Sequence, residues 1–150
     1  MLAVAFLDLD GFKAVNDRHG HAVGDKFLVE LAQIMKAALR EGDTLGRLGG
    51  DEFVAILADL DGAQKCEPVL QRLLEAASTS ITLSEGTFQV SASIGVTLYP
   101  QDDVDADQLL RHADQAMYVA KAEGKNRYRL FDVAQDSASK RHREILESIR

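Results

Sequence analysis

The sequence predicts an α/β sandwich with a mixed central sheet flanked by helices. Segments with helical and strand-like hydrophobic patterns alternate along the chain, as in α/β domains. Two short apolar-rich runs, residues 44–48 and 53–57, are joined through Gly49-Gly50 and indicate a β-hairpin. Because a hairpin requires an antiparallel pair, we expect a mixed sheet rather than the parallel sheet of a doubly wound Rossmann domain.

The first half of the chain contains one buried strand and two helices by its hydrophobic periodicity. Residues 2–7 form a continuous apolar run, which is typical of a strand buried on both faces. Residues 25–40 carry an apolar stripe at helical spacing, with Asp25 expected in the first turn, where an acid complements the helix dipole. A second helix is expected at 67–78, since Pro68 is tolerated in a first turn.

The second half predicts a long strand, a helix and a final strand. Residues 88–99 alternate strictly between apolar and small or polar types, which indicates a strand with one face on a core. Residues 107–123 show an amphipathic helical pattern that stops at Gly124. Residues 127–131 predict the last strand.

Composition favours one cytoplasmic enzyme-sized domain. The chain has 150 residues, 46% of them hydrophobic, enough for a substantial core. A net charge of −7 argues against broad nucleic-acid binding. Cys66 is the only cysteine, so no internal disulfide can form; we expect it to be a small surface or helix residue. No apolar stretch approaches the ~18 residues of a membrane span, and residues 1–7 do not resemble a leader peptide.

Two acidic clusters are candidates for a cation site. Asp51 and Glu52 follow the glycines of the hairpin, where the backbone can turn tightly. Asp8 and Asp10 follow the first strand and point to the same side while the strand persists. Such carboxylates suit Mg²⁺, which prefers oxygen ligands. Taken separately, each cluster is also compatible with a solvated turn or a polar strand end.

Five sequence blocks occurring in order resemble the GGDEF family of diguanylate cyclases. They are FLDLDGFKAVND (6–17), GHAVGD (20–25), RLGGDEF (47–53), SASIGV (91–96) and ADQAMYVAKAEGKN (113–126). The resemblance covers about residues 3–131 and implies a palm-like fold shared with nucleotide cyclases. It also implies the condensation of two GTP molecules into cyclic di-GMP with release of pyrophosphate, in a homodimer.

The resemblance implies a metal site for Mg²⁺ or Mn²⁺. Asp8 and Asp51 match the family's metal ligands, together with the carbonyl of Leu9. Glu52 matches the other signature acid, which binds a second metal or assists deprotonation of the attacking 3′-hydroxyl. Asp10 is expected to be structural.

The resemblance also implies where the base of GTP binds. Asn16 and Asp25 match the guanine-binding pair, and Leu28, one helical turn later, is expected to pack against the base. A carboxylate accepts hydrogen bonds from the N–H groups of guanine, while an amide both donates and accepts. Without the resemblance, Asn16 would be interpreted as a helix cap and Asp25 as a first-turn acid.

Phosphate contacts are expected from two places. Lys121 and Lys125 match the phosphate-binding pair and are expected on one helical face, although arginine is commoner at the second position. The backbone amides of Gly11, Phe12 and Lys13 are expected to form a second phosphate cradle.

A regulatory site is expected at Arg40 and Asp43. This Arg-x-x-Asp sequence begins nine residues before Gly49, the offset of the family's product-inhibition site. Arginine can stack on and hydrogen-bond guanine, and aspartate can accept from its edge. The same sequence is also compatible with a local ion pair.

The expected GGDEF domain spans residues 1–133 and lacks the helix that usually precedes the first strand of the family. Residues 134–150 resemble a helical linker to an EAL phosphodiesterase domain. Two functions are therefore compatible with the sequence: an active diguanylate cyclase, or a GTP-binding regulatory module that controls an attached phosphodiesterase. An upstream sensor domain is a further expected partner.

Overall fold

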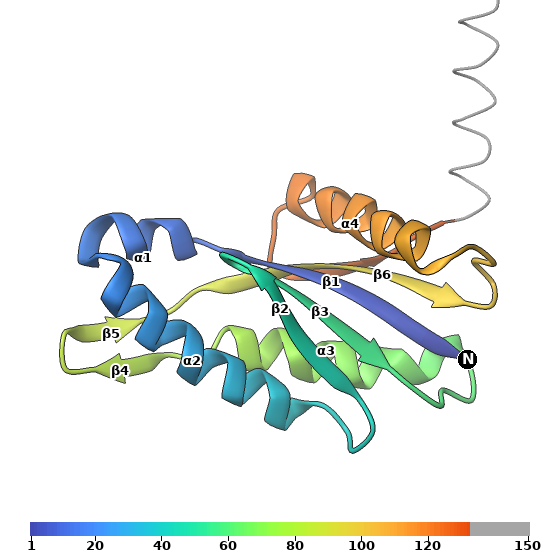
Figure 1. Cartoon of the computed structure of the whole chain (residues 1–150), viewed down its shortest axis with the longest axis horizontal. Coiled ribbons are helices and arrows are strands. Elements are labelled where there is room, and N and C mark those ends of the chain that lie inside the picture. Colours follow the sequence, from blue (N-terminus) through green and yellow to red (C-terminus); the bar gives the residue numbers. More distant parts are fainter. Residues whose placement is uncertain (133–150) are drawn as a thin grey trace, which may run out of the picture.

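A computed structural model describes residues 1–132, so the linker expected at 134–150 lies outside the described residues. Its centre is a five-stranded sheet in the order β2-β3-β1-β6-β7 (Figure 1). The strands are β1 (Leu2–Asp10), β2 (Thr44–Gly49), β3 (Glu52–Leu57), β6 (Ser91–Tyr99) and β7 (Arg127–Leu130). β1 is antiparallel to both β3 and β6, and β7 is parallel to β6. The expectation of a mixed sheet with an antiparallel hairpin is confirmed.

Helices cover both faces of the sheet (Figure 1). α2 (His21–Ala38) and α3 (Cys66–Ala77) lie on one face, and α4 (Ala106–Ala122) lies on the other. α1 (Phe12–His19) follows directly after β1, and the 3-10 turn η1 (Ala63–Lys65) precedes α3.

The alternation of β1 explains why a continuous apolar run lies at the centre of the fold. Ala3, Ala5, Leu7 and Leu9 are buried in the larger core with α2 and α3. Val4 and Phe6 point the other way and pack with Leu109, Ala113 and Met117 of α4. Both faces of this strand are therefore dry, as expected.

The prediction of one long strand over 88–99 is wrong. Phe88 ends β5 (Gly86–Phe88), which pairs with β4 (Ile81–Leu83) in a separate two-stranded sheet. β6 begins only at Ser91. Local alternation cannot reveal that two consecutive strands belong to different sheets.

β6 is also buried on both faces rather than one. Its polar positions Ser93 and Thr97 are 0% and 1% exposed because α4 covers them. Gly95 allows this close approach: a Cβ there would lie 1.9 Å from the Ala113 carbonyl oxygen.

One smaller expectation also needs correction, and another is narrowed. α2 begins at His21, so Asp25 lies beyond the first turn of the helix. The helix starts earlier because Gly20, at φ 88°, separates α2 from α1, which the sequence pattern did not reveal. Cys66 is the first residue of α3, so of the two expected positions it has the helical one; it is fully buried, and its thiol donates to the Ala63 carbonyl oxygen at 2.9 Å.

The end of α4 decides where its lysines lie. Gly124 (φ 127°) terminates the helix, with the Gly124 N–H bonded to the Lys121 carbonyl and the Lys125 N–H bonded to that of Ala120. This pair of hydrogen bonds is a Schellman motif. Lys121 is in the last turn, but Lys125 lies beyond the helix at φ 64°, so the two do not share a helical face as expected.

None of the helices among residues 1–132 is long and apolar enough to span a membrane.

Candidate functional site

The two acidic clusters meet at one edge of the sheet. In the pairing of β1 with β3, Asp8 is the register partner of Glu52. The N–H of Leu9 donates to the Asp51 carbonyl oxygen at 3.0 Å, which ties the hairpin tip to the end of β1. The N–H and C=O of a strand residue point to the same side, so the carbonyl of Leu9 also faces the tip. The ends of β1, the hairpin and α4 thus converge with the start of α1 (Figure 1).

Lys121 lies between the two aspartates of β1. Its Nζ is 2.7 Å from Asp8 Oδ2 and 3.7 Å from Asp10 Oδ1, which confirms that both carboxylates point to one side. Asp10 Oδ2 also accepts from the hydroxyls of Ser93 at 2.8 Å and Ser91 at 3.4 Å. These bonds anchor Asp10 to β6 and favour a structural role for it.

The carboxylates at this end of the sheet carry more negative charge than Lys121 neutralises. Burial and the neighbouring charge of Asp51 raise the pKa of Asp8 against the opposing effect of Lys121. Burial and the charges of Asp8, Asp51 and Asp114 likewise raise the pKa of Glu52. Each raised pKa means that a further negative charge is disfavoured here, and a cation would relieve this repulsion.

Asp114 belongs to this edge, although the sequence reasoning did not select it. Burial and the charge of Asp8 raise its pKa. It lies in α4 seven positions before Lys121, a spacing that places two residues on one side of a helix. That spacing was the available signal.

Two buried carboxylate oxygens, Asp8 Oδ1 and Asp10 Oδ1, have no hydrogen-bond partner. No group of three histidine, cysteine or acidic side chains within residues 1–132 is close enough to enclose a metal. Mg²⁺ usually binds one or two carboxylates and completes its shell with water and substrate phosphates. The donor set of Asp8, the Leu9 carbonyl and Asp51 therefore fits an ion that arrives with a nucleotide.

The start of α1 offers free backbone donors beside the acids. Gly11 caps the helix at φ 92°, and no side chain accepts from the first N–H groups. Phe12 and Lys13 are the first two helical residues. N–H groups at a helix start bind phosphate well, so the expected cradle has suitable geometry.

The expected base-binding residues lie on α1 and α2. Asn16 is inside α1 and is not a cap, which corrects the alternative interpretation. Its buried Oδ1 has no partner and lies against Gly24, where a Cβ would come within 1.8 Å of it. Asp25 follows Gly24 and lines a depression of about 390 Å³ that reaches Leu83. Asn16 and Asp25 are thus brought close together.

Leu28 opens to a different depression. It is 2% exposed and lines a groove of about 190 Å³ between α2 and the hairpin, together with residues that include Leu45, Arg47 and Phe53. Asp25 and Leu28 therefore line two different depressions.

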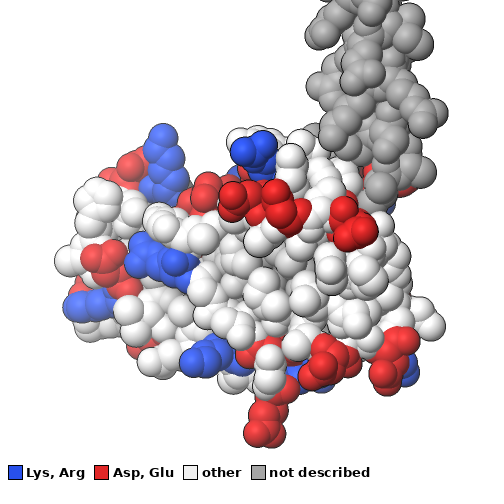
Figure 2. All heavy atoms as spheres, turned by 45° about the vertical axis from the view of Figure 1, so that its right-hand side comes forward, with Lys and Arg blue, Asp and Glu red and all other residues white. Residues whose placement is uncertain are grey.

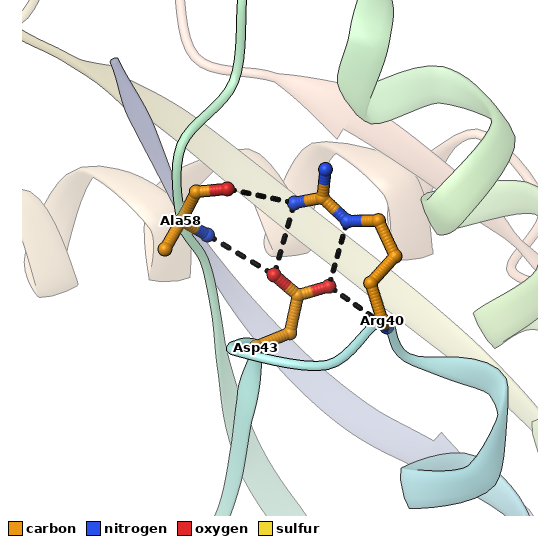
Figure 3. Close-up of polar contacts among 3 residues, drawn as sticks. All are labelled: Arg40, Asp43 and Ala58. Atoms are coloured by element: carbon orange, nitrogen blue, oxygen red, sulfur yellow. Dashed lines mark hydrogen bonds and ion pairs between the residues drawn. The ribbon is translucent and has the colours of Figure 1, made fainter.

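Arg40 and Asp43 lie at the other end of the sheet, where they form an ion pair with each other (Figure 3). Arg40 Nε and Nη2 donate to the two carboxylate oxygens of Asp43 at 3.0 and 2.9 Å. Both residues also bind the backbone of Ala58. Arg40 Nη2 donates to the Ala58 carbonyl oxygen at 2.8 Å, and the Ala58 N–H donates to Asp43 Oδ1 at 3.1 Å. The side chain of Asp43 is 1% exposed, whereas that of Arg40 is 35% exposed. The pair ties the loop before β2 to the end of β3.

A second buried polar group escaped the sequence reasoning. Asp102 Oδ2 accepts from the Thr97 hydroxyl at 2.7 Å and lies 2.6 Å from His112 Nδ1. The imidazole of His112 also stacks on Phe131, with ring centroids 4.1 Å apart. The available signal was a histidine on the apolar stripe of α4, because such a residue requires a polar partner.

Known proteins resemble this chain over nearly its whole length. The family model described as "Diguanylate cyclase, GGDEF domain" matches residues 1–127. The bifunctional diguanylate cyclase/cyclic di-GMP phosphodiesterase MucR of Pseudomonas aeruginosa is 40% identical over 148 residues, which are 99% of this chain and 22% of MucR. The diguanylate cyclase TpbB of the same species is 39% identical over 96% of this chain and 33% of its own length. The chain thus spans about a fifth to a third of these relatives.

Solved structures agree with the fold. The crystal structure of the GGDEF domain of TpbB (also YfiN) has a TM-score of 0.83 at 41% identity, and the match covers 88% of this chain and 83% of that one. The GGDEF domain of DgcB from Caulobacter crescentus, solved in complex with c-di-GMP, has a TM-score of 0.75 at 25% identity, over 86% of this chain and 77% of that one. The fold, the five motifs and these similarities agree, and the chain belongs to the GGDEF family of diguanylate cyclase domains.

Proposed function

We propose that this chain is the catalytic domain of a diguanylate cyclase, which condenses two GTP molecules into cyclic di-GMP and releases pyrophosphate. The observation that supports this most directly is the meeting of Asp8 with the Asp51-Glu52 hairpin tip beside Lys121. Phosphoryl transfer depends on positioning and on neutralising phosphate charge. This edge offers acids for a cation and a lysine for an anion side by side, with Lys121 Nζ 2.7 Å from Asp8 Oδ2.

Asp8, the Leu9 carbonyl and Asp51 are the proposed ligands of Mg²⁺ or Mn²⁺. The unpartnered Asp8 Oδ1 and the raised pKa of Asp8 support this assignment. When bound, the metal would neutralise phosphate charge and orient the attacking and leaving oxygens. Glu52, the partner of Asp8 in the sheet, is assigned one of two roles: ligand of a second metal, or base for the 3′-hydroxyl.

The remaining contacts with GTP follow from the same edge. Lys121, Lys125 and the free N–H groups of Gly11, Phe12 and Lys13 are proposed to bind the phosphates. Asn16, Asp25 and Leu28 are proposed to bind guanine. The partnerless Oδ1 of Asn16 supports this, because a guanine N–H would satisfy it.

The guanine assignment is tested by substituting Asp25. Only guanine offers N1–H and N2–H₂ as donors, so Asp25→Ala should weaken GTP binding far more than ATP binding in calorimetry. An equal loss for both nucleotides would remove Asp25 from the base site.

The active species is proposed to be a face-to-face homodimer, because one subunit holding one GTP cannot close a two-fold symmetric product. Figure 2 shows acidic side chains along the upper rim of the presented face, next to basic ones and above a broad uncharged surface. Acids at the catalytic edge, among them Asp8, Glu52 and Asp114, would repel a second copy unless cations neutralise them. We place the reaction in the cytoplasm, where GTP is available.

Arg40 and Asp43 are proposed to bind cyclic di-GMP as an inhibitory product. The partial exposure of the Arg40 side chain supports this, since its guanidinium could stack on a guanine while the pair stays intact. Cyclic di-GMP binding measured by calorimetry should be lost in Arg40→Ala and kept in Arg72→Ala, an exposed arginine of α3. Binding that is unchanged in Arg40→Ala would leave the pair a purely structural tie.

A regulatory module without turnover is not favoured, because the acids, the lysines and the guanine pair are all present and relatives are named diguanylate cyclases. An attached EAL domain and an upstream sensor remain proposals, consistent with the bifunctional relative. Incubating the chain with GTP and Mg²⁺ and detecting cyclic di-GMP and pyrophosphate by chromatography tests the proposal. If the chain binds GTP tightly but forms no more product than the Asp51→Asn variant does, it is instead a binding module.

A further inference from the structure

The tip of the catalytic hairpin has an irregular backbone. The pairing of β2 with β3 shifts register between Arg47 and Gly49, so Leu48 has no regular partner. Gly50 follows in the left-handed region at φ 49°. Two adjacent glycines give this turn more conformational freedom than any other residue pair would. The β-ladder alone therefore does not fix the orientation of Asp51.

Two further hydrogen bonds hold the tip. Arg47 Nε donates to the Gly50 carbonyl oxygen at 3.0 Å, and the Leu9 N–H donates to the Asp51 carbonyl oxygen at 3.0 Å. These carbonyls belong to the two peptide planes on either side of the Asp51 Cα. Because both planes are held, the φ and ψ angles of Asp51 are restrained, and so is the direction of its carboxylate.

We propose that Arg47 is a positioning residue, which latches the hairpin so that the carboxylate of Asp51 faces Asp8. This inference rests on the proposed function, since it concerns the reaction that Asp51 serves. Arg47 acts through its Nε–H on a backbone carbonyl, and its side chain is exposed. Its contribution is therefore to geometry rather than to the hydrophobic core.

The alternative is that Arg47 acts only by its positive charge near an acidic edge. Two substitutions separate these roles. Glutamine has the same number of side-chain bonds up to its amide nitrogen as arginine has up to Nε, so Arg47→Gln keeps a donor at that position without the charge. Arg47→Lys keeps the charge but replaces the donor by a methylene.

The first measurement is steady-state kinetics with Mg²⁺ and GTP. Arg47→Ala and Arg47→Lys should lower kcat by about 10- to 100-fold, as expected for a small misplacement of a reacting group. KM for GTP should change less than about threefold, because substrate binding is not removed. Arg47→Gln should retain most of kcat, and Arg72→Ala, an exposed arginine of α3, should match the unsubstituted chain.

The second measurement does not depend on activity. Amide hydrogen exchange across residues 49–53 of the nucleotide-free chain should accelerate by about fivefold in Arg47→Ala and Arg47→Lys, the loss of one hydrogen bond, and stay slow in Arg47→Gln. Unchanged exchange in Arg47→Ala would overturn the latch. So would a kcat of Arg47→Lys that equals or exceeds the kcat of Arg47→Gln. If the unsubstituted chain makes no cyclic di-GMP, the proposed function fails while the exchange comparison still decides the latch.

Discussion

Lys121 Nζ lies 2.7 Å from Asp8 Oδ2, so the lysine proposed for phosphate is paired with the carboxylate proposed for metal. Burial alone would lower the pKa of Lys121, but its contacts with Asp8 and the nearby Asp10 and Asp51 raise it. The ammonium thus occupies the position of a cation in the nucleotide-free chain. On the proposed assignments, binding of a metal–nucleotide complex would exchange these partners: Asp8 would hold the metal and Lys121 would hold the phosphates.

This exchange predicts opposite effects of one substitution. Lys121→Gln should tighten Mg²⁺ binding in the absence of nucleotide by roughly tenfold, because a unit charge ~4 Å from another contributes ~1–4 kcal/mol at intermediate dielectric. The same variant should weaken GTP binding. Calorimetric titration with MgCl₂ alone and then with GTP measures both effects.

Lys125→Gln is the matched control, since Lys125 lies beyond the end of α4. It should weaken GTP without tightening Mg²⁺. Identical Mg²⁺ affinity in the chain with and without Lys121 would contradict the exchange of partners.

Gly24 predicts a link between helix packing and base recognition. A Cβ at this position would lie 1.8 Å from Asn16 Oδ1 and 3.3 Å from the ring of Phe12. Gly24→Ala should therefore displace the Asn16 amide and lower stability by about 1–3 kcal/mol. GTP affinity should fall about tenfold or more, the loss of one hydrogen bond of ~1.5 kcal/mol.

The control for this prediction is Gly46→Ala, because a Cβ at Gly46 meets nothing within 4 Å. Thermal melting and GTP titration of both variants check the effect. Equal GTP affinity in the two variants would show that Asn16 does not bind the guanine base.

Removing the buried carboxylate of Asp102 should lower the stability of the fold without removing a group of the proposed catalytic site. Asp102→Ala leaves the Thr97 hydroxyl and His112 Nδ1 without their partner in a dry environment. The free energy of unfolding should fall by about 3 kcal/mol. Urea unfolding measures it, with the exposed neighbour Asp103→Ala as control. Equal unfolding midpoints would show that water replaces these bonds at no cost.

Asp43 predicts an acid-dependent contribution to stability. Burial alone would raise its pKa, but hydrogen bonds from Arg40 and from the Ala58 N–H outweigh burial and hold the pKa below the ordinary value of 3.8. A carboxyl with a depressed pKa stabilises the fold above its ordinary value, and this stabilisation is lost as pH falls through the folded-state pKa. Asp43→Asn should cost about 1–3 kcal/mol near pH 7, and the difference from the unsubstituted chain should shrink below pH 3.8.

Urea unfolding at several pH values checks this sign, with the exposed Asp61→Asn as control. A difference that grows on acidification would mean that the ion pair is not what stabilises this loop.

The parts of the fold that depend on local patterns were predictable from the sequence. The run at 2–7 and the Gly49-Gly50 hairpin specify β1, β2 and β3 because burial and turn geometry are local properties. The break after Phe88 was not predictable, since alternation persists across two strands that join different sheets.

The candidate site shows the same division. The motifs identified Asp8, Asp51 and Lys121, which the fold brings together. Arg47 was not selected, because its contribution depends on a contact within the folded hairpin that no local pattern encodes. Asp114 was signalled only by its helical spacing from Lys121, and its proximity to Asp8 depends on how α4 packs on β1. The orphan Asn16 Oδ1 likewise follows from how α1 packs on α2.

The continuous helix α4 connects two distant contacts of the domain. His112, near the middle of α4, stacks on Phe131, and Lys121, in its last turn, meets Asp8, about 14 Å away at 1.5 Å per residue. Phe131, directly after β7, is thus connected through α4 to the lysine that pairs with Asp8. In a Phe131→Ala variant, which removes the stacking, the Lys121 side-chain NMR signal should shift, because the two contacts share α4.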